Sequence, residues 1–259
     1  MANLLHDIQS DLLAFLVLLS LIVGLIVSFI HFFNPEKFSA HPKRSSITPI
    51  IMTLLGLPVL IDLVRVGGLG TLFSILLLLV LFWNLYVIVS QLLKKKFGSF
   101  VENGGIAVFP ALIFGGCLTA GYLTYVEITS SLTICGIEFP GCGTVQSSSY
   151  AMLLGFFPVA LLGLLGYLAI LAAWIINRSK LERVKPFTAY IQWGLCLFGV
   201  VFSMYLTYIE VFVLRATCSW CITSAVLMNL LLWYSTSPAS AAWLKRQKEL
   251  EEEFEDDED

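Results

Sequence analysis

Charged residues are scarce in this chain of 259 residues, since Asp, Glu, Lys and Arg together make up only 13% of it. Soluble domains carry about 25% charged residues, so the composition excludes a soluble globular protein. The formal net charge of −3 excludes a basic nucleic-acid-binding protein, and no nucleic-acid partner is expected. The chain instead has 58% hydrophobic residues, which indicates a helical protein embedded in membrane lipid.

The apolar residues are grouped into runs that reach the roughly 20 residues a helix needs to cross a bilayer. There are seven such runs, at residues 11–33, 47–65, 69–92, 104–127, 150–176, 187–211 and 219–236. The second is the weakest, because Pro49 and Pro58 interrupt it and an expected i,i+3 ion pair, Asp62 and Arg65, lies at its end. A re-entrant or interfacial segment is the alternative there. The predicted fold class is all-α integral membrane, with about seven transmembrane helices.

The basic residues are unevenly distributed between the two faces that seven spans define. Thirteen of the fifteen Lys and Arg residues fall on one face, in the loops 34–46, 93–103 and 177–186 and in the tail. The other face keeps only Arg65 and Arg215. Because loops rich in Lys and Arg face the cytoplasm, we expect the N-terminus outside and the C-terminus in the cytoplasm.

One internal repeat precedes two of the cysteines. Residues 122–135 read YLTYVEITSSLTIC and residues 205–218 read YLTYIEVFVLRATC, so seven positions and the offset to the cysteine match. The repeat predicts two helical hairpins packed side by side, each carrying a cysteine to the outer face. Glu127 and Glu210 end the matching helices and have two interpretations: a role in proton transfer or, as favoured here, solvation at the headgroup level.

Four of the six cysteines fall on the predicted outer face, where disulfides persist. Cys135 and Cys142 lie in the 128–149 loop, and Cys218 and Cys221 form a C-x-x-C pair where the last span begins. Cysteines in this arrangement can exchange disulfides, bind a metal or an iron–sulfur cluster, or form structural disulfides. Redox chemistry is favoured, because none of the three His residues lies near them in the sequence.

The depth of these cysteines predicts a route for electrons. Cys218 is expected to be exposed at the edge of a loop and Cys221 to lie about one turn deeper, facing the bilayer. Electrons could then pass from a soluble thiol to the loop pair, to the C-x-x-C pair and to a membrane quinone. Trp220, between the two cysteines, is expected either to touch the quinone ring or to lie in the interfacial aromatic belt. The alternative from another class is a non-enzymatic transport or assembly module with structural disulfides.

The sequence around the cysteines resembles a known family. Residues 135–167 read CGIEFPGCGTVQSSSYAMLLGFFPVALLGLLGY and residues 205–225 read YLTYIEVFVLRATCSWCITSA. The order of two loop cysteines, a Ser, a helix with Gly and Pro, and a C-x-x-C pair resembles the vitamin K epoxide reductase family in its bacterial, quinone-linked form. The resemblance covers residues 104–236 and implies a four-helix-bundle catalytic core around a quinone.

Two parts of the chain lie outside this resemblance. Residues 1–103 would form three additional membrane helices of unknown role. Residues 237–259 would form a cytoplasmic tail, and because its sequence is almost wholly acidic from Glu249 onward, we expect that part to be solvated and disordered.

The resemblance implies roles for the four cysteines. Cys135 would exchange disulfides with a separate thioredoxin-fold protein on the extracytoplasmic side. Cys142 would pass electrons to Cys218. Cys221 would react with a quinone of the ubiquinone or menaquinone type, which reaches it through the membrane lipid.

The resemblance also implies a binding residue, a substrate class and a location. Ser148 would support the quinone, although the run 147–149 could instead cap a helix that begins near Tyr150. Animal members carry a Tyr four residues after the last cysteine, where this chain has Ala225, so protein disulfide formation is expected rather than vitamin K epoxide reduction. The implied location is a bacterial inner (plasma) membrane with the active site on the extracytoplasmic face.

Overall fold

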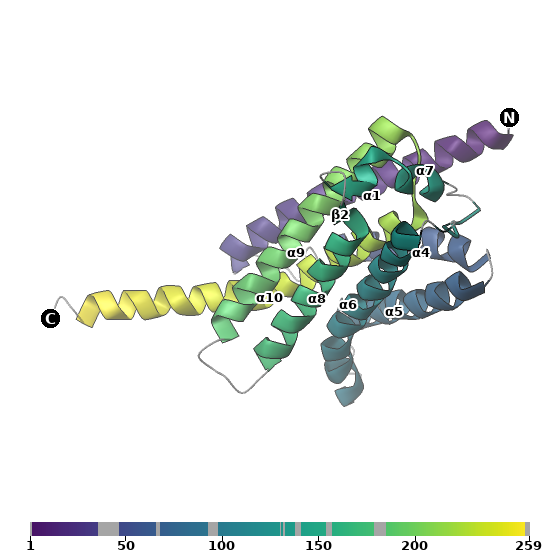
Figure 1. Cartoon of the computed structure of the whole chain (residues 1–259). Coiled ribbons are helices and arrows are strands. Elements are labelled where there is room, and N and C mark those ends of the chain that lie inside the picture. The colour runs from purple at the N-terminus through teal and green to yellow at the C-terminus, as the bar shows by residue number, and fades with distance from the viewer. Residues whose placement is uncertain are drawn as a thin grey trace.

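The computed structural model describes residues 2–35, 47–65, 68–92, 98–129, 131, 133–137, 141–153, 157–178 and 185–256. It confirms the predicted all-α membrane fold, because long apolar helices dominate the described residues (Figure 1). Six described helices have the length and composition to cross a membrane, at Leu12–Phe33, Thr48–Arg65, Thr71–Ser90, Ala107–Thr129, Val159–Arg178 and Phe187–Leu214.

Seven long helices form the bundle. Their bounds are α1 (Ala2–Phe33), α4 (Ile47–Arg65), α5 (Gly68–Leu92), α6 (Gly98–Thr129), α8 (Val159–Arg178), α9 (Lys185–Tyr208) and α10 (Ser219–Asp256). Short elements join them: α7 (Cys142–Gln146), the 3-10 helix η1 (Ser149–Ala151), the strands β1 (Met152–Leu153) and β2 (Phe157–Pro158), and the π-helical turn η2 (Ile209–Leu214). The weak second span is a continuous helix, α4, in spite of Pro58 inside it.

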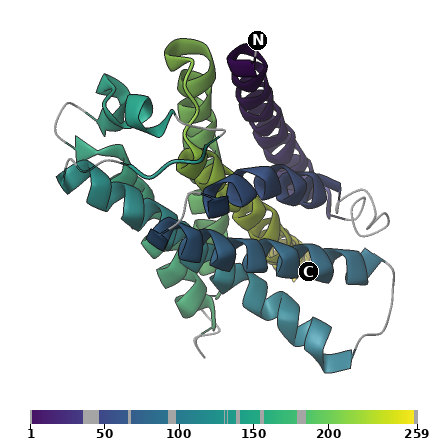
Figure 2. The same cartoon turned by 90° about the vertical axis from the view of Figure 1, so that its right-hand side faces the viewer.

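The central helix is α10, which packs against α1, α4, α6 and α9 (Figures 1 and 2). The first half of α10 is the predicted seventh span. This half is less apolar than the six spans above, because it carries buried polar residues such as Asn229, Ser235 and Thr236. In lipid, buried polar side chains hold neighbouring helices together. Here the Tyr234 hydroxyl donates to Asn84 of α5, and Asn84 Nδ2 donates to Thr53 Oγ1 of α4 at 2.8 Å. The first three helices are therefore packed onto the rest of the bundle through polar contacts as well as apolar ones.

Two predicted segments have a different structure. The span predicted at 150–176 is wrong at its start, because Ser149–Ala151 form η1, and Met152–Leu153 and Phe157–Pro158 form an antiparallel pair of strands in which Met152 faces Pro158. The helix α8 begins only at Val159. The tail predicted to be disordered is helical as far as Asp256, since α10 continues through Pro238 and extends beyond the other helices (Figure 1). Lys245 and Arg246 each lie 3.7 Å from Glu249 in that extension, which supports the helix.

The two termini lie at opposite ends of the bundle. In Figure 1 the N-terminal end of α1 lies at the same end as α7, and the C-terminal end of α10 lies at the other. Most of the predicted basic loop residues, at 36–46, 93–97 and 179–184, lie outside the described residues. The orientation of the chain across the membrane therefore stays a prediction.

Candidate active site

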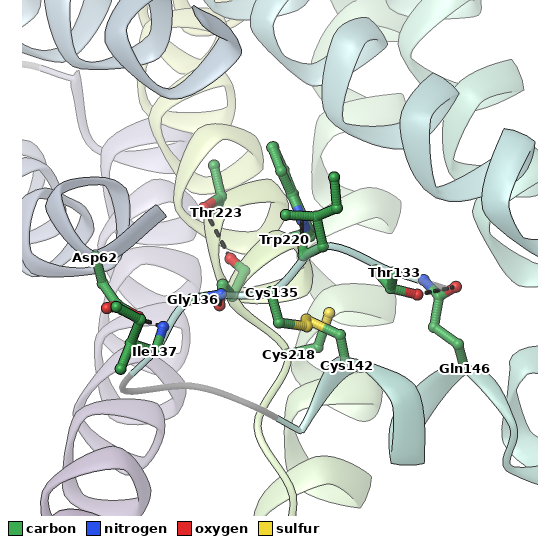
Figure 3. Close-up of a disulfide and its surroundings, with 12 residues drawn as sticks. Asp62, Thr133, Cys135, Gly136, Ile137, Cys142, Gln146, Cys218, Trp220 and Thr223 are labelled. Atoms are coloured by element: carbon green, nitrogen blue, oxygen red, sulfur yellow. Dashed lines mark hydrogen bonds between the residues drawn. A yellow bond between two sulfur atoms is a disulfide. The ribbon is translucent and has the colours of Figure 1, made fainter. Parts of the chain in front are cut away.

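The loop pair of cysteines forms a disulfide at the end of the bundle near α7 (Figure 3). The Cα atoms of Cys135 and Cys142 lie 6.0 Å apart, which is within the usual range for a disulfide. Cys142 begins α7 and is fully buried, whereas Cys135 is only partly buried. Of this pair, Cys135 is the cysteine that faces outward.

Cys218 lies close to this disulfide, because Thr217, the residue before it, lies against Gly141, the residue before Cys142. Figure 3 shows the Cys218 sulfur next to the bonded pair, and Cys218 and Cys142 belong to the same buried cluster. The prediction that Cys218 is exposed is wrong, because its exposed fraction is 0%. The loop covers it closely: a Cβ on Gly141 would lie 2.6 Å from the Thr217 nitrogen and 2.8 Å from the Thr217 oxygen. Glycine at 141 thus lets the Cys142 backbone approach the segment that leads to Cys218.

Cys221 lies one turn further along α10 and is partly buried. Its thiol is within hydrogen-bonding reach of Cys218, and both thiols are free. The other two free cysteines, Cys117 and Cys196, lie inside α6 and α9. The structure therefore brings together Cys135, Cys142, Cys218 and Cys221, and leaves the two cysteines within spans apart.

A cavity of about 150 Å³ lies against Cys221, between α6, α8, α9 and the start of α10. Its walls are mostly apolar, with aromatic side chains such as Phe198. Among its few polar groups are Cys221, Ser148, Glu127 and Glu210. Apolar walls with a small number of polar groups are typical of ligand pockets. A quinone headgroup, an apolar ring with two carbonyl oxygens, fits this combination.

Glu210 connects the C-x-x-C pair to the cavity. Its Oε2 accepts a hydrogen bond from the Cys218 backbone N–H at 3.1 Å, and its carboxyl hydrogen-bonds the Cys221 thiol. Glu210 lies on η2, which is a π-helical turn. Such turns are frequent at functional sites. The turn ends at Arg215, whose left-handed conformation (φ 48°) returns the chain toward Cys218. Sequence reasoning favoured a solvated Glu210, and this is wrong, because its exposed fraction is only 2%.

Glu127, the matching residue of the repeat, lines the same cavity. Its Oε2 is buried and has no hydrogen-bond partner in the part of the chain that the structure describes. A buried polar atom without a partner is costly unless something satisfies it. A polar ligand in the cavity could do so: a protonated Glu127 carboxyl can donate to a quinone carbonyl oxygen, and an ionised one can accept from a quinol hydroxyl.

The two predicted binding residues beside the cysteines have different positions. Ser148 lines the cavity, and its hydroxyl donates to the Val145 carbonyl at 2.6 Å instead of capping a helix. Trp220 is buried against the Cys135 segment: its Nε1 donates to the Ile134 carbonyl at 2.8 Å and its ring lies 4.8 Å from that of Tyr122. Trp220 is not among the residues that line this cavity, so its contact with a quinone stays a prediction.

The segment that carries Cys135, residues 133–137, is held by backbone hydrogen bonds to three helices. The Ile134 N–H donates to the Tyr122 hydroxyl of α6 at 2.9 Å. The Gly136 N–H donates to Ser219 Oγ of α10 at 3.3 Å, and the Ile137 N–H donates to Asp62 Oδ1 of α4 at 3.1 Å (Figure 3). We call residues 133–137 the redox segment. Sequence reasoning missed Asp62 as a site residue, because it suggested only an ion pair with Arg65.

Metal binding was a sequence-based alternative for the four cysteines. Among the described residues, no group of three or more His, Cys, Asp or Glu side chains is placed to hold a metal ion. The described residues instead form two adjacent cysteine pairs, one partly exposed and one beside an apolar cavity.

One comparison with known proteins bears on this arrangement. The model of the vitamin K epoxide reductase family matches residues 107–236, half of the 259-residue chain. The matched segment includes the four cysteines of the site and the residues of α8 and α9. The helices α1, α4 and α5 lie outside it.

Proposed function

Because the chain belongs to the vitamin K epoxide reductase family, whose members are membrane oxidoreductases, we propose that it transfers electrons from protein thiols to a quinone. The electron donor is the dithiol of a separate thioredoxin-fold protein, which becomes a disulfide. The acceptor is a membrane quinone of the ubiquinone or menaquinone type, which takes up two electrons and two protons. The site works on the extracytoplasmic face of a bacterial plasma membrane, and the net result is disulfide formation.

The observation that carries this proposal is the order of the sulfur atoms. A partly buried Cys135 is bonded to a buried Cys142, and Cys142 lies beside Cys218 (Figure 3). Cys221 lines an apolar cavity. Thiol–disulfide exchange proceeds by attack of a thiolate on an adjacent disulfide sulfur, so each neighbouring pair can support one step.

The proposed steps balance in electrons and protons. A partner thiolate attacks Cys135, which forms a mixed disulfide with the partner and releases Cys142 as a thiol. The partner's second thiol then attacks the mixed disulfide, so the partner leaves with its own disulfide and the loop pair is left as a dithiol. Cys142 then attacks a Cys218–Cys221 disulfide, and Cys135 closes on Cys142 again. This leaves the loop pair bonded and Cys218 and Cys221 as thiols, which is the arrangement in the structure. The quinone supplies the oxidising power that returns Cys218 and Cys221 to a disulfide.

The residues around the cavity have defined tasks in this proposal. The protonated Glu127 carboxyl donates to a quinone oxygen, and the Ser148 oxygen, whose proton is directed at the Val145 carbonyl, accepts from the quinol hydroxyl. The apolar walls exclude water from Cys221. Glu210 holds Cys218 through its backbone N–H and receives the thiol proton of Cys221.

The pairing of the cysteines tests the relay against structural disulfides. In full-length Cys135→Ala protein, we expect Cys142 to form a bond with Cys218, because the two are adjacent and Cys142 has lost its other partner. Peptide mapping by mass spectrometry after alkylation would detect this bond and a free Cys221. A structural-disulfide module would leave Cys142 as a free thiol, and that result would overturn the proposal.

The partner can be sought with a complementary variant. In Cys142→Ala protein, Cys135 has no internal partner and should accumulate as a mixed disulfide with the donor protein. Purification under non-reducing conditions and mass spectrometry would identify the protein bonded to Cys135. We expect a thioredoxin fold with an exposed pair of cysteines.

Gly141→Ala is expected to weaken the transfer between the two pairs by at least about tenfold, because its Cβ would collide with the Thr217 backbone and separate Cys142 from Cys218. The measurement is the rate at which the Cys142–Cys218 bond forms in the Cys135→Ala background. Gly143→Ala is the matched control, since a Cβ there meets nothing within 4 Å. Equal rates in the two variants would contradict the close approach assigned to Gly141.

A further inference from the structure

We propose that Asp62 of α4 is a positioning residue for Cys135, and that it gives the helices before the family-matched segment a role in the redox reaction. The inference rests on the proposed function only in taking Cys135 as the cysteine that meets the partner. Asp62 lies 45 residues before residue 107, where the family match begins. Nothing in the match assigns a role to it.

The contact between Asp62 and the redox segment is direct, and it is buried on the Asp62 side. Asp62 Oδ1 accepts the Ile137 N–H at 3.1 Å, and the exposed fraction of Asp62 is 2%. Hydrogen bonds from a backbone N–H to a carboxylate are stronger than neutral ones, and they gain strength away from water. Figure 3 shows Asp62 pointing at the redox segment from the side opposite Gln146.

The neighbouring glycine supplies a second observation. A Cβ on Gly136 would collide with the Asp62 carboxylate and lie 3.1 Å from Ser219 Oγ. The backbone at Gly136 therefore fits into a space between α4 and the start of α10. Because Gly136 and Ile137 donate to Ser219 and Asp62 respectively, two successive amides join the C-x-x-C helix to α4.

This geometry has a consequence for the relay. Cys135 precedes Gly136 directly, so a redox segment held by Asp62 keeps Cys135 close to Cys142 and favours the bonded loop pair. When the pair is reduced or Cys142 bonds to Cys218, Cys135 no longer needs that position. Asp62 thus stabilises the bonded state of the loop pair relative to its reduced state.

The test measures the loop disulfide itself instead of turnover. The full chain carries Cys218→Ser and Cys221→Ser, so that only Cys135 and Cys142 can pair with each other at this site. The protein is equilibrated with mixtures of reduced and oxidised dithiothreitol, and the free thiols at Cys135 and Cys142 are counted by alkylation and mass spectrometry. Asp62→Ala is expected to shift the equilibrium by about tenfold toward the dithiol, because it removes a charged hydrogen-bond acceptor.

Two further variants separate positioning from general stability. Asp62→Asn keeps an oxygen acceptor and is expected to restore most of the wild-type equilibrium. Thr53→Ala removes a buried hydrogen-bonding side chain from the same helix α4, far from the loop, and should leave the equilibrium unchanged. An unchanged equilibrium in Asp62→Ala, or an equal shift in Thr53→Ala, would overturn the inference.

A loop-side variant covers the case in which Asp62→Ala does not fold. Gly136→Ala keeps the Asp62 side chain, but its Cβ would push the carboxylate away from the redox segment. It should therefore shift the equilibrium of the loop disulfide in the same direction as Asp62→Ala. An unchanged equilibrium there would also overturn the inference. The proposed function fails by a different result, since Cys135→Ala protein with full thiol-dependent quinone reduction would reject the relay without altering the measured effect of Asp62.

Discussion

Cys221→Ala protein is expected to lose thiol-dependent quinone reduction by about 10³-fold or more, since removing a reacting group leaves only residual activity. Cys221 is the cysteine that faces the cavity, so without it the electron pair that reaches Cys218 has no route to the acceptor. Cys218→Ala should have an equally large effect for another reason, because it removes the sulfur that lies next to the loop disulfide. The measurement is the rate of quinone absorbance change in membranes that contain each variant, with a dithiol as the electron donor.

A matched cysteine controls for the general effect of removing a thiol. Cys117 is a free, partly buried cysteine of α6 that does not line the cavity, so Cys117→Ala should keep its activity within about twofold. Full activity in either Cys218→Ala or Cys221→Ala would reject the relay. The two variants should also differ in pairing, because only Cys221→Ala protein can accumulate a bond between Cys142 and Cys218.

The part of the site that sequence could predict is the part encoded in local patterns. Apolar runs predicted the helices, and the spacing of the cysteines predicted a loop pair and a C-x-x-C pair at one end of the bundle. The error at residues 150–158 has a physical cause, since an apolar run has the same hydropathy whether it forms a helix or a short pair of strands. Pro158 and the glycine at 155 were local signs that the helix starts later.

The part that sequence could not predict depends on contacts between distant residues. Cys218 is buried because the loop around Gly141 lies over it, and nothing adjacent to Cys218 in the sequence indicates that cover. Asp62 reaches Ile137 across 75 positions, from a helix outside the family-matched segment. Glu210 was recognised through the repeat, but its burial depends on how η2 packs beside the cavity.

In the proposed reaction, proton transfer gives Glu210 a task beyond holding Cys218. Oxidation of Cys218 and Cys221 to a disulfide releases two protons, and reduction of a quinone consumes two. Glu210 has an exposed fraction of only 2% and Cys221 is partly buried, so these protons need a protein group within hydrogen-bonding reach of the thiol. Glu210 is such a group, because its carboxyl contacts the Cys221 thiol and also lines the cavity.

Glu210→Gln protein is therefore expected to show a fall in kcat of about 100-fold, the range typical of losing a group that transfers a proton. The amide oxygen of Gln can still accept the Cys218 N–H, so the backbone geometry and the KM for the quinone should change little. The measurement is steady-state kinetics with a soluble quinone analogue, together with mapping of the disulfides to establish that both pairs still form.

Glu127→Gln is the informative comparison, because Glu127 lines the same cavity through the matching position of the repeat. One oxygen of the Glu127 carboxyl is buried and has no hydrogen-bond partner among the described residues. Loss of this carboxyl should therefore raise the KM for the quinone and leave kcat nearly unchanged. A large fall in kcat for both variants would mean that the two carboxyls act together in proton transfer. If Glu210→Gln protein keeps the wild-type kcat, the protons take another path, and Glu210 only holds Cys218.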